Sequence, residues 1–413
     1  MNSTGQEALA RTALLRRRTG TVLALVCLSL AGLGGRPATA RDAAPARADW
    51  KVVKTQPLKG LTLSLSAPVL VARSKGYLWF PTLVRLGNND LLALMSNYAD
   101  VHTTTSTCRA SWSGNGGLTW SEPKDGLYSD SQVRLPDGDH LLLPYYLYPR
   151  KQGMGAPYQR IHKGKRQLEV VKEGVTVTGW PRPDKSFDVK LGLSGFVING
   201  QTVELKGGGY LATLYGYFKG DNRYSLVAAE SQDGVRWRVR SVVAGADCKL
   251  KGSEGPCEAA LCRLKDRRLM CVFRLASNVP YGQSWSSDEG QTWTEPVGMA
   301  GPFSVQPSLA VRKDGTVVLS GGRPGLFLWI NLDGTGKTWQ RVDLQAHHNA
   351  CVPKEPIDKP NHTSSYTEVV AVDNTHLLCI YDRIPHGWER IPKESAQTNS
   401  VWVVRIGLDK PPK

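Results

Sequence analysis

Short apolar runs separated by polar turns recur along most of the chain. Thr82–Leu86 and Asp90–Ser96 flank a turn at 87–89, and Pro307–Val311 and Thr316–Gly321 flank a Lys-Asp-Gly turn. Short runs bounded by Gly, Asn and Asp are typical of β-hairpins. The sequence between them shows no helical periodicity, so the pattern predicts an all-β chain.

One stretch, Ser286–Trp293, matches the pattern S-x-D-x-G-x-T-W at every fixed position. Its Ser and Asp can hydrogen-bond to neighbouring backbone, its Gly permits a positive φ, and its Trp is a large apolar anchor. Residues 113–120 match with Asn in place of Asp, 231–237 are one residue shorter, and 331–339 are one residue longer. These four motifs predict tight turns that anchor themselves in the adjacent sheet.

The spacing of the motifs predicts how the strands are organised. Their closing tryptophans lie at positions 120, 237, 293 and 339, with gaps of 117, 56 and 46 residues. The first gap is about twice the others, and Trp180 falls near its middle. A period of this size with strands between the copies is produced by a β-propeller. We therefore expect a six-bladed β-propeller of four-stranded antiparallel blades.

Residues 1–40 have the features of a secretory signal peptide. Three arginines at 16–18 precede an apolar run from Thr21 to Leu33, which is followed by Ala38-Thr39-Ala40. This is a charged region, a short apolar region and a cleavage site in the expected order. The apolar run is too short to span a bilayer. We expect cleavage near Ala40 and export to the periplasm or the extracellular space, without stable membrane insertion.

The remaining chain is expected to be a flexible lead-in at 41–55, which is polar and rich in Ala and Pro, and a propeller domain at 56–413. The whole chain has a formal charge of +16. Without the five Arg and one Glu of residues 1–40, 47 basic and 35 acidic residues remain, a charge of +12. The basic residues are scattered and not interleaved with aromatic residues in long runs. An acidic glycan or an anionic surface is therefore a better candidate partner than nucleic acid.

The cysteine and histidine residues leave several possibilities open. Seven cysteines follow residue 40, and an odd number leaves at least one thiol free or intermolecular. Cys248 and Cys257 flank a polar loop and could pair, while Cys262 and Cys271 could pair or be buried as small apolar residues. No Cys/His cluster has the spacing of a zinc site, and the adjacent His347-His348 are expected in a solvated loop. No metal or organic cofactor is predicted.

Polar residues that begin or follow the inner strands of the expected blades are candidates for a functional site, because the loops there face the centre of a propeller. In chain order these candidates are Asp100, Glu258, Arg274, Arg323 and Tyr366. Each also has a structural interpretation. The arginines could be strand-end cations paired with acids, the tyrosine a packed side chain, Glu258 the start of a strand, and Asp100 a solvated loop carboxylate.

The motifs are Asp boxes, also called BNR repeats, and they resemble those of the sialidase (neuraminidase) superfamily. The order Asp, Glu, Arg, Arg, Tyr is similar to that of the sialidase active site. The resemblance implies that Asp100 is the acid/base, Tyr366 the nucleophile and Glu258 the group that activates it. It also implies that Arg274 and Arg323 bind the substrate carboxylate.

The resemblance has a physical basis. A sialoside carries a carboxylate at its anomeric carbon, which would repel a carboxylate nucleophile, so a neutral Tyr assisted by a Glu is preferred. An arginine guanidinium binds a carboxylate through two parallel hydrogen bonds and keeps its charge.

One position departs from the family pattern. The family's first arginine lies in Arg-Ile-Pro, and this chain has Trp79-Phe80-Pro81 there. Two arginines then remain for the carboxylate unless Arg73 folds back into the site. Trp79 could instead offer an aromatic surface to a sugar, or lie in the core of a blade. Glu389 resembles the glutamate that orients the family's first arginine.

The sequence therefore predicts a sialidase-like exo-glycoside hydrolase that releases a terminal acidic, sialic-acid-like sugar from a glycoconjugate with retention. Two alternatives remain. The chain could be a catalytically silent propeller that binds glycans, or a propeller polysaccharide lyase that uses Tyr366 and a His as base and acid.

Overall fold

β-Strands make up most of the regular structure. The structure, a computed structural model, describes residues 50–87, 90–100, 106–180, 195–388 and 398–409. These ranges hold 28 strands and one helix, α1 (Leu344–Cys351), which confirms the all-β prediction. The predicted signal peptide, most of the predicted lead-in and Glu389 lie outside the described residues.

Three sheets contain four antiparallel strands each, with strands in chain order. The first sheet is β4 (Trp79–Arg85), β5 (Leu91–Ser96), β6 (Thr107–Ser113) and β7 (Lys124–Leu127). The second is β18 (Cys257–Arg263), β19 (Leu269–Arg274), β20 (Pro280–Ser286) and β21 (Val297–Phe303). The third is β22 (Val305–Val311), β23 (Val317–Gly322), β24 (Phe327–Asn331) and β25 (Gln340–Asp343).

A six-stranded sheet joins the beginning of the described chain to its end. Its strands are β1 (Val52–Leu58), β2 (Leu61–Ser66), β3 (Val69–Ser74), β26 (Thr367–Ala371), β27 (His376–Arg383) and β28 (Asn399–Asp409). The long strand β28 pairs with β27 along one edge and with both β2 and β3 along the other. These pairings connect distant parts of the sequence, so residues near 60 and near 405 stabilise each other.

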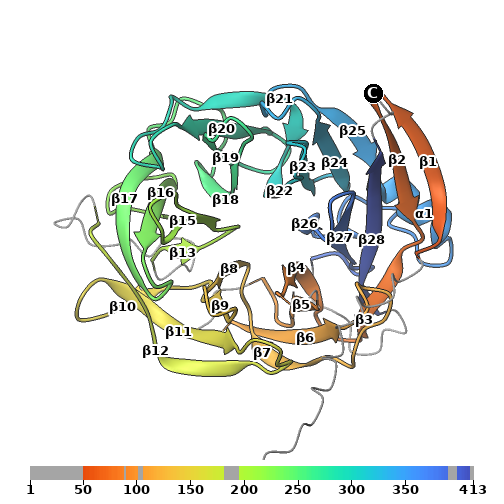
Figure 1. Ribbon diagram of the computed structural model, residues 1–413, viewed down its shortest axis with the longest axis horizontal. Coiled ribbons are helices and arrows are strands. Elements are labelled where there is room, and N and C mark those ends of the chain that lie inside the picture. The colour runs from red at the N-terminus through yellow and green to blue at the C-terminus, as the bar shows by residue number, and fades with distance from the viewer. Residues whose placement is uncertain (1–49, 88–89, 101–105, 181–194, 389–397, 410–413) are drawn as a thin grey trace, which may run out of the picture. The chain divides into compact units, whose positions relative to one another are not determined.

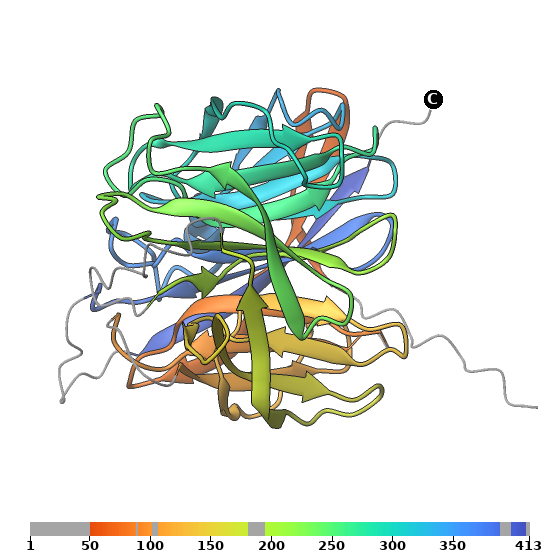
Figure 2. The ribbon, with the colours of Figure 1, turned by 90° about the vertical axis from the view of Figure 1, so that its left-hand side faces the viewer.

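The fifth sheet has ten strands. Eight form a continuous order, namely β13 (Val197–Ile198), β15 (Tyr210–Gly216), β16 (Ser225–Ser231), β17 (Arg236–Ala244), β12 (Glu169–Thr178), β11 (Met154–Ile161), β9 (His140–Leu143) and β8 (Ser131–Arg134). The short strands β10 (Tyr148–Pro149) and β14 (Val203–Glu204) pair with β11 and β15. The parallel pair β12–β17, which lies side by side in Figure 2, joins two antiparallel halves. The structure therefore has five hydrogen-bonded sheets where six separate four-stranded blades were predicted.

Within the described part, the sheets follow one another around a common centre (Figure 1). The strands β4, β8, β18, β22 and β26 lie nearest that centre, and β7, β12, β17 and β21 lie farther out. Each sheet is packed between two neighbours. Every residue of β5 and β15 is accordingly buried, which explains why their sequences, apart from Ser96 and Thr213, are apolar and do not alternate with polar residues.

The Asp boxes connect the outer strands of the sheets. In the box that joins β20 to β21, Asp288 Oδ1 accepts hydrogen bonds from Ser286 Oγ (2.8 Å) and the Thr292 amide (2.9 Å). Ser286 Oγ accepts from the amide of Gly290 (2.8 Å), whose φ of 81° favours glycine. The indole of Trp293 donates to Ser241 Oγ in the neighbouring sheet (3.0 Å). The box thus closes a turn and attaches it to the next sheet.

The structure decides between the alternatives left open for the cysteines and corrects the expectation for the adjacent histidines. Cys262 and Cys271 are buried, as one alternative predicted, and Cys248 and Cys257 do not pair. All seven described cysteines are free. Cys262 pairs in register with Met270, and Cys271 with Leu261, so the two thiols point to opposite faces of the sheet. His347-His348 are buried in α1 and not in a solvated loop. A helix forms there because the Asp343 carboxylate caps it by accepting from the Ala346 amide (2.8 Å).

Replacing Asp288 with Ala should lower the free energy of unfolding by about 1–2 kcal/mol, because its carboxylate loses Ser286 and Thr292 as donors. Urea unfolding followed by tryptophan fluorescence measures this change. Ser287→Ala, at an exposed position in the same turn, is the matched control. Equal midpoints for the two variants would contradict a stabilising role for the box.

Candidate active site

A cavity of about 270 Å³ lies where the inner strands of the sheets begin. Its described walls carry seven tyrosines, four carboxyl side chains and two arginines. Five of the residues predicted from sequence line it together, namely Asp100, Glu258, Arg274, Arg323 and Tyr366. They come from positions as far apart as 100 and 366, so the arrangement of the sheets brings them to one place.

Equivalent backbone irregularities direct side chains into this cavity. Phe80, Glu258 and Gln306 are each the second residue of an inner strand, and their φ values are 47°, 32° and 33°. At each of these positions the pairing register with the next strand shifts, as in a β-bulge. A positive φ is costly for non-glycine residues and occurs most often where function requires a particular side-chain direction. All three side chains line the cavity.

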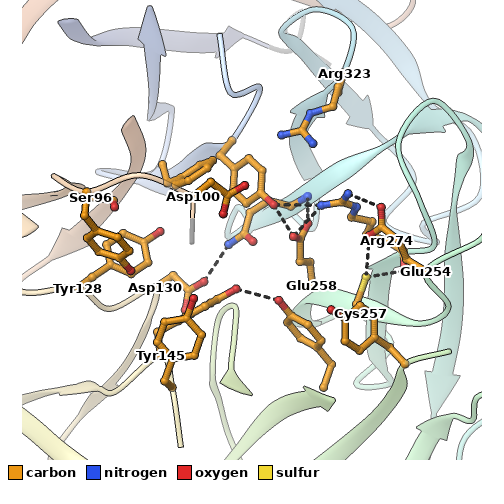
Figure 3. A pocket seen from close by; sticks show the side chains of 17 residues that line it. Ser96, Asp100, Tyr128, Asp130, Tyr145, Glu254, Cys257, Glu258, Arg274 and Arg323 are labelled. Atoms are coloured by element: carbon orange, nitrogen blue, oxygen red, sulfur yellow. Dashed lines mark hydrogen bonds and ion pairs between the residues drawn. The ribbon is translucent and has the colours of Figure 1, made fainter. Parts of the chain in front are cut away.

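Glu258, Arg274 and Tyr366 form a connected group in the cavity. Figure 3 shows Glu258 and Arg274 next to each other there. The Tyr366 hydroxyl donates a short hydrogen bond to Glu258 Oε1. Arg274 Nη1 donates to the same oxygen (2.8 Å) and to the Tyr366 hydroxyl (3.1 Å). The other oxygen of Glu258 accepts from the Gln306 amide (2.9 Å). Glu258 and Arg274 are buried, so the pair acts with little screening by water.

The electrostatics of this group favour an ionised Glu258 and a neutral Tyr366. Burial raises the pKa of Glu258, but the charge of Arg274 and hydrogen bonds from Tyr366, Arg274 and Gln306 outweigh it, so the pKa is lowered overall. Burial and the charge of Glu258 raise the pKa of Tyr366 well above its ordinary value. A carboxylate acceptor therefore contacts a phenol that keeps its proton at rest.

The two arginines differ in how they are held. Arg274 Nη2 also contacts Glu254 Oε1 (2.6 Å), so its charge is offset by two carboxylates. Arg323 has no carboxylate ion pair within the described residues. Its Nη2 donates to the Ser364 carbonyl (2.7 Å), and burial lowers its pKa from the ordinary value without removing its charge.

Asp100 and Asp130 complete the set of carboxyl groups. Asp100 lies on the cavity wall, where desolvation, followed by the charge of Glu258, raises its pKa. Asp130, which the sequence did not suggest, is buried, and burial raises its pKa to about 7. Its Oδ2 accepts from Asn199 Nδ2 (2.5 Å) and Gln306 Nε2 (3.0 Å).

A buried carboxylate outside the cavity orders the segment that precedes Tyr366. Asp382 accepts from the Ser364 amide (2.7 Å), Thr363 Oγ1 (2.9 Å), Ser364 Oγ and the Phe80 amide (3.1 Å). These contacts join β27 to the start of β4 and to the loop before β26. Asp382 therefore positions Tyr366 and Phe80 relative to each other, and the two rings lie 4.7 Å apart.

Neither Arg73, suggested as a replacement for the missing arginine, nor Trp79, which occupies its place in the sequence, lines the cavity. Trp79 is 1% exposed, and its indole donates to the Tyr98 carbonyl (2.9 Å), so it is a core residue. The positive φ of Phe80 turns the neighbouring ring into the cavity instead. Arg73 forms an ion pair with Glu355 (2.5 Å), and this contact holds its side chain away from the cavity wall.

Glu389 lies outside the described residues.

Within the described part, no group of three or more His, Cys, Asp and Glu side chains could hold a metal ion. The described helix is too short to cross a membrane.

Comparisons with known proteins agree with this architecture. The family model of a BNR repeat-like domain matches residues 177–379. A crystal structure of a protein of unknown function from Dyadobacter fermentans aligns with a TM-score of 0.62 and 17% identity, over 85% of this chain and 100% of that chain. A search of curated proteins found no match.

Two enzyme structures are also similar. The Hadza microbial sialidase Hz136 aligns with a TM-score of 0.54 and 13% identity, over 81% of this chain and 66% of the sialidase. An α-L-arabinanase from Penicillium chrysogenum, complexed with arabinobiose, aligns with a TM-score of 0.54 and 16% identity, over 82% and 98%. At these identities the similarity shows the fold alone. The fold of this chain is similar to that of these two enzymes, and residues 177–379 are similar to a BNR repeat-like domain.

Glu368 in β26 is another buried carboxyl with a raised pKa. It lies outside the main cavity, and its Oε2 accepts from the Leu83 amide (2.9 Å). Burial raises its pKa to about 8. The folded protein therefore binds a proton here that the unfolded chain releases above its ordinary pKa of about 4.3.

Glu368→Gln should make the protein more stable at pH 8.5, by more than about 1 kcal/mol, and change its stability little at pH 4. The wild type loses stability as the pH rises from the unfolded to the folded pKa, whereas an uncharged amide does not titrate. Urea unfolding at the two pH values measures the difference. Glu173→Gln, at an exposed position, is the control. A variant destabilised equally at both pH values would contradict this explanation.

Proposed function

We propose that the cavity is the active site of a retaining exo-glycoside hydrolase that removes a terminal, sialic-acid-like sugar from a glycoconjugate. The observation that carries the proposal is the hydrogen bond from Tyr366 to the buried Glu258 carboxylate, with Arg274 bridging both groups. A nucleophile in contact with a base that a third group orients is the arrangement expected for covalent catalysis.

In the first step, the Tyr366 oxygen attacks the anomeric carbon while Glu258 takes the phenol proton. The bond to the leaving oxygen breaks as Asp100 protonates that oxygen. The products are a glycosyl–tyrosine and a free alcohol. In the second step, Asp100 accepts a proton from water, the water attacks the same carbon, and the tyrosine oxygen leaves and recovers its proton from Glu258. Two inversions give net retention.

The state of each group suits this sequence. Because the pKa of Tyr366 is raised, a free phenolate is unfavourable, so its proton moves to Glu258 only as the bond to carbon forms. The pKa of Asp100 is raised, which is the direction that an acid in the first step requires. Arg323, which has no carboxylate partner in the described part, is the cation best placed to bind a substrate carboxylate.

A second candidate is hydrolysis of an uncharged sugar. Four carboxyl groups and two arginines line the described cavity, and one arginine is already offset by Glu254 and Glu258. This ratio of carboxyl groups to arginines makes the cavity less favourable to an anion than a cavity with three free arginines would be. The tyrosine-rich wall would suit a neutral sugar ring. No histidine is among the described residues of the cavity wall, so the lyase hypothesis gains no support there.

The proposal includes two further points from the sequence. The two antiparallel halves of the ten-stranded sheet would count as two blades, which gives six in total. The protein would be exported after cleavage near Ala40, where a glycoconjugate substrate is accessible.

Tyr366→Phe should reduce kcat/KM for a fluorogenic sialoside by at least about 100-fold, because the nucleophilic oxygen is removed. A panel of sialosides and α-L-arabinosides, assayed with the wild type, distinguishes the two candidate substrates. Tyr158→Phe, a buried tyrosine outside the cavity, is the matched control. Full activity of Tyr366→Phe, or no turnover of any glycoside by the wild type, would overturn the proposal.

Asp100→Asn should reduce activity most for substrates with poor leaving groups, by about 10²–10⁴-fold, because these need protonation of the departing oxygen. A substrate with an activated phenol as leaving group should be affected less in its first step. The measurement compares kcat/KM for both substrates in wild type and variant. An equal loss with both would argue against an acid/base role.

A further inference from the structure

Arg323 is held by aromatic rings, in contrast to Arg274. Its guanidinium carbon lies 4.1 Å from the centre of the Trp388 ring and 5.4 Å from that of Tyr366. An aromatic face attracts a cation without neutralising it. Arg274, by contrast, contacts two carboxylates. The positive charge of Arg323 is therefore the one in the described cavity that remains available to an anion.

Not all N–H groups of Arg323 have a strong hydrogen-bond acceptor among the described residues. Nη2 donates to the Ser364 carbonyl (2.7 Å), and Nη1 makes a longer contact with Ser277 Oγ (3.4 Å). Its Nε is buried and has no hydrogen-bond partner among the described residues. The Trp388 ring lies against the guanidinium, so we expect this contact to limit the directions in which the remaining N–H groups can point.

Trp388 is itself attached to the loop that leads to Tyr366. Its indole nitrogen donates to the Thr363 carbonyl (3.3 Å). The side chain is 43% exposed, so it fills little of the core and its replacement should not unfold the protein. Trp388 thus connects Arg323 to the segment that carries the proposed nucleophile.

We propose that Trp388 is a positioning residue that orients Arg323 for the carboxylate of the substrate. This inference rests on the function proposed above. It adds that the Trp388–Arg323 contact makes the site prefer a sugar with a carboxylate over an uncharged sugar. An acidic residue in place of the indole would hold Arg323 equally well but would offset its charge. The aromatic ring fixes the guanidinium and leaves that charge for the ligand.

The test measures binding separately from turnover. Titration calorimetry compares N-acetylneuraminic acid with its uncharged methyl ester in wild type, Trp388→Leu and Trp388→Phe. We expect Trp388→Leu to weaken binding of the acid by about 3- to 10-fold and to leave ester binding unchanged, while Trp388→Phe keeps most of the affinity. If the wild type hydrolyses a sialoside, the leucine variant should raise KM with little change in kcat.

The control variant is Arg341→Gln, which removes a comparable pair with Phe327 (5.2 Å) outside the cavity wall. Thermal unfolding of each variant shows whether it is folded. Unchanged affinity of Trp388→Leu for the acid, or an equal loss for acid and ester, would overturn the inference.

The outcomes separate this inference from the proposed function. If Trp388 affects acid binding but the wild type hydrolyses no glycoside, the inference stands and the catalytic proposal fails. If the wild type hydrolyses sialosides and Trp388→Leu keeps the same KM and affinity, the function stands and the inference fails. If the wild type does not bind the acid, both the inference and the acidic substrate are wrong.

Discussion

The buried carboxylate of Glu258 is the group on which the candidate site depends. A carboxylate removed from water is costly unless its oxygens are satisfied, and here Arg274, Tyr366 and the Gln306 amide supply the partners. Those partners come from β19, from the residue before β26 and from β22. Correct placement of three sheets is therefore a condition for the stability of one charge. The same contacts place a neutral phenol against an ionised base, which is the arrangement that catalysis would use.

The backbone supports this arrangement at a local cost. Inner strands β4, β18 and β22 each have a positive φ at their second residue, and each has a register shift at that point. Regular strands would direct alternate side chains to the two faces of a sheet. The irregular start instead turns Phe80, Glu258 and Gln306 into the cavity, and the packed sheets on both sides maintain the strained conformations.

Much of the cavity could be predicted because its residues occupy corresponding places in a repeated structure. Glu258 begins an inner strand and Arg274 ends the strand that pairs with it, so their proximity follows from one hairpin. Asp130 and Trp388 gave no such signal, since their roles come from contacts with residues 25 to 176 positions away. For Trp79 the sequence left two interpretations open, a sugar-binding surface and the core of a blade. Trp79 aligned with an arginine of the family pattern. The positive φ of Phe80 turns the Phe80 ring into the cavity and leaves Trp79 in the core.

The sequence by itself determined the all-β class, the turns formed by the Asp boxes, and five of the side chains that line the cavity. These features are local or periodic, because a turn depends on a few neighbouring residues and a repeat places equivalent residues at equivalent sites. The tertiary structure alone decided the joining of β12 to β17, the placement of Trp79 in the core, and the difference between a neutralised Arg274 and an available Arg323. Those properties depend on burial and on which distant group lies alongside, and no local pattern encodes them.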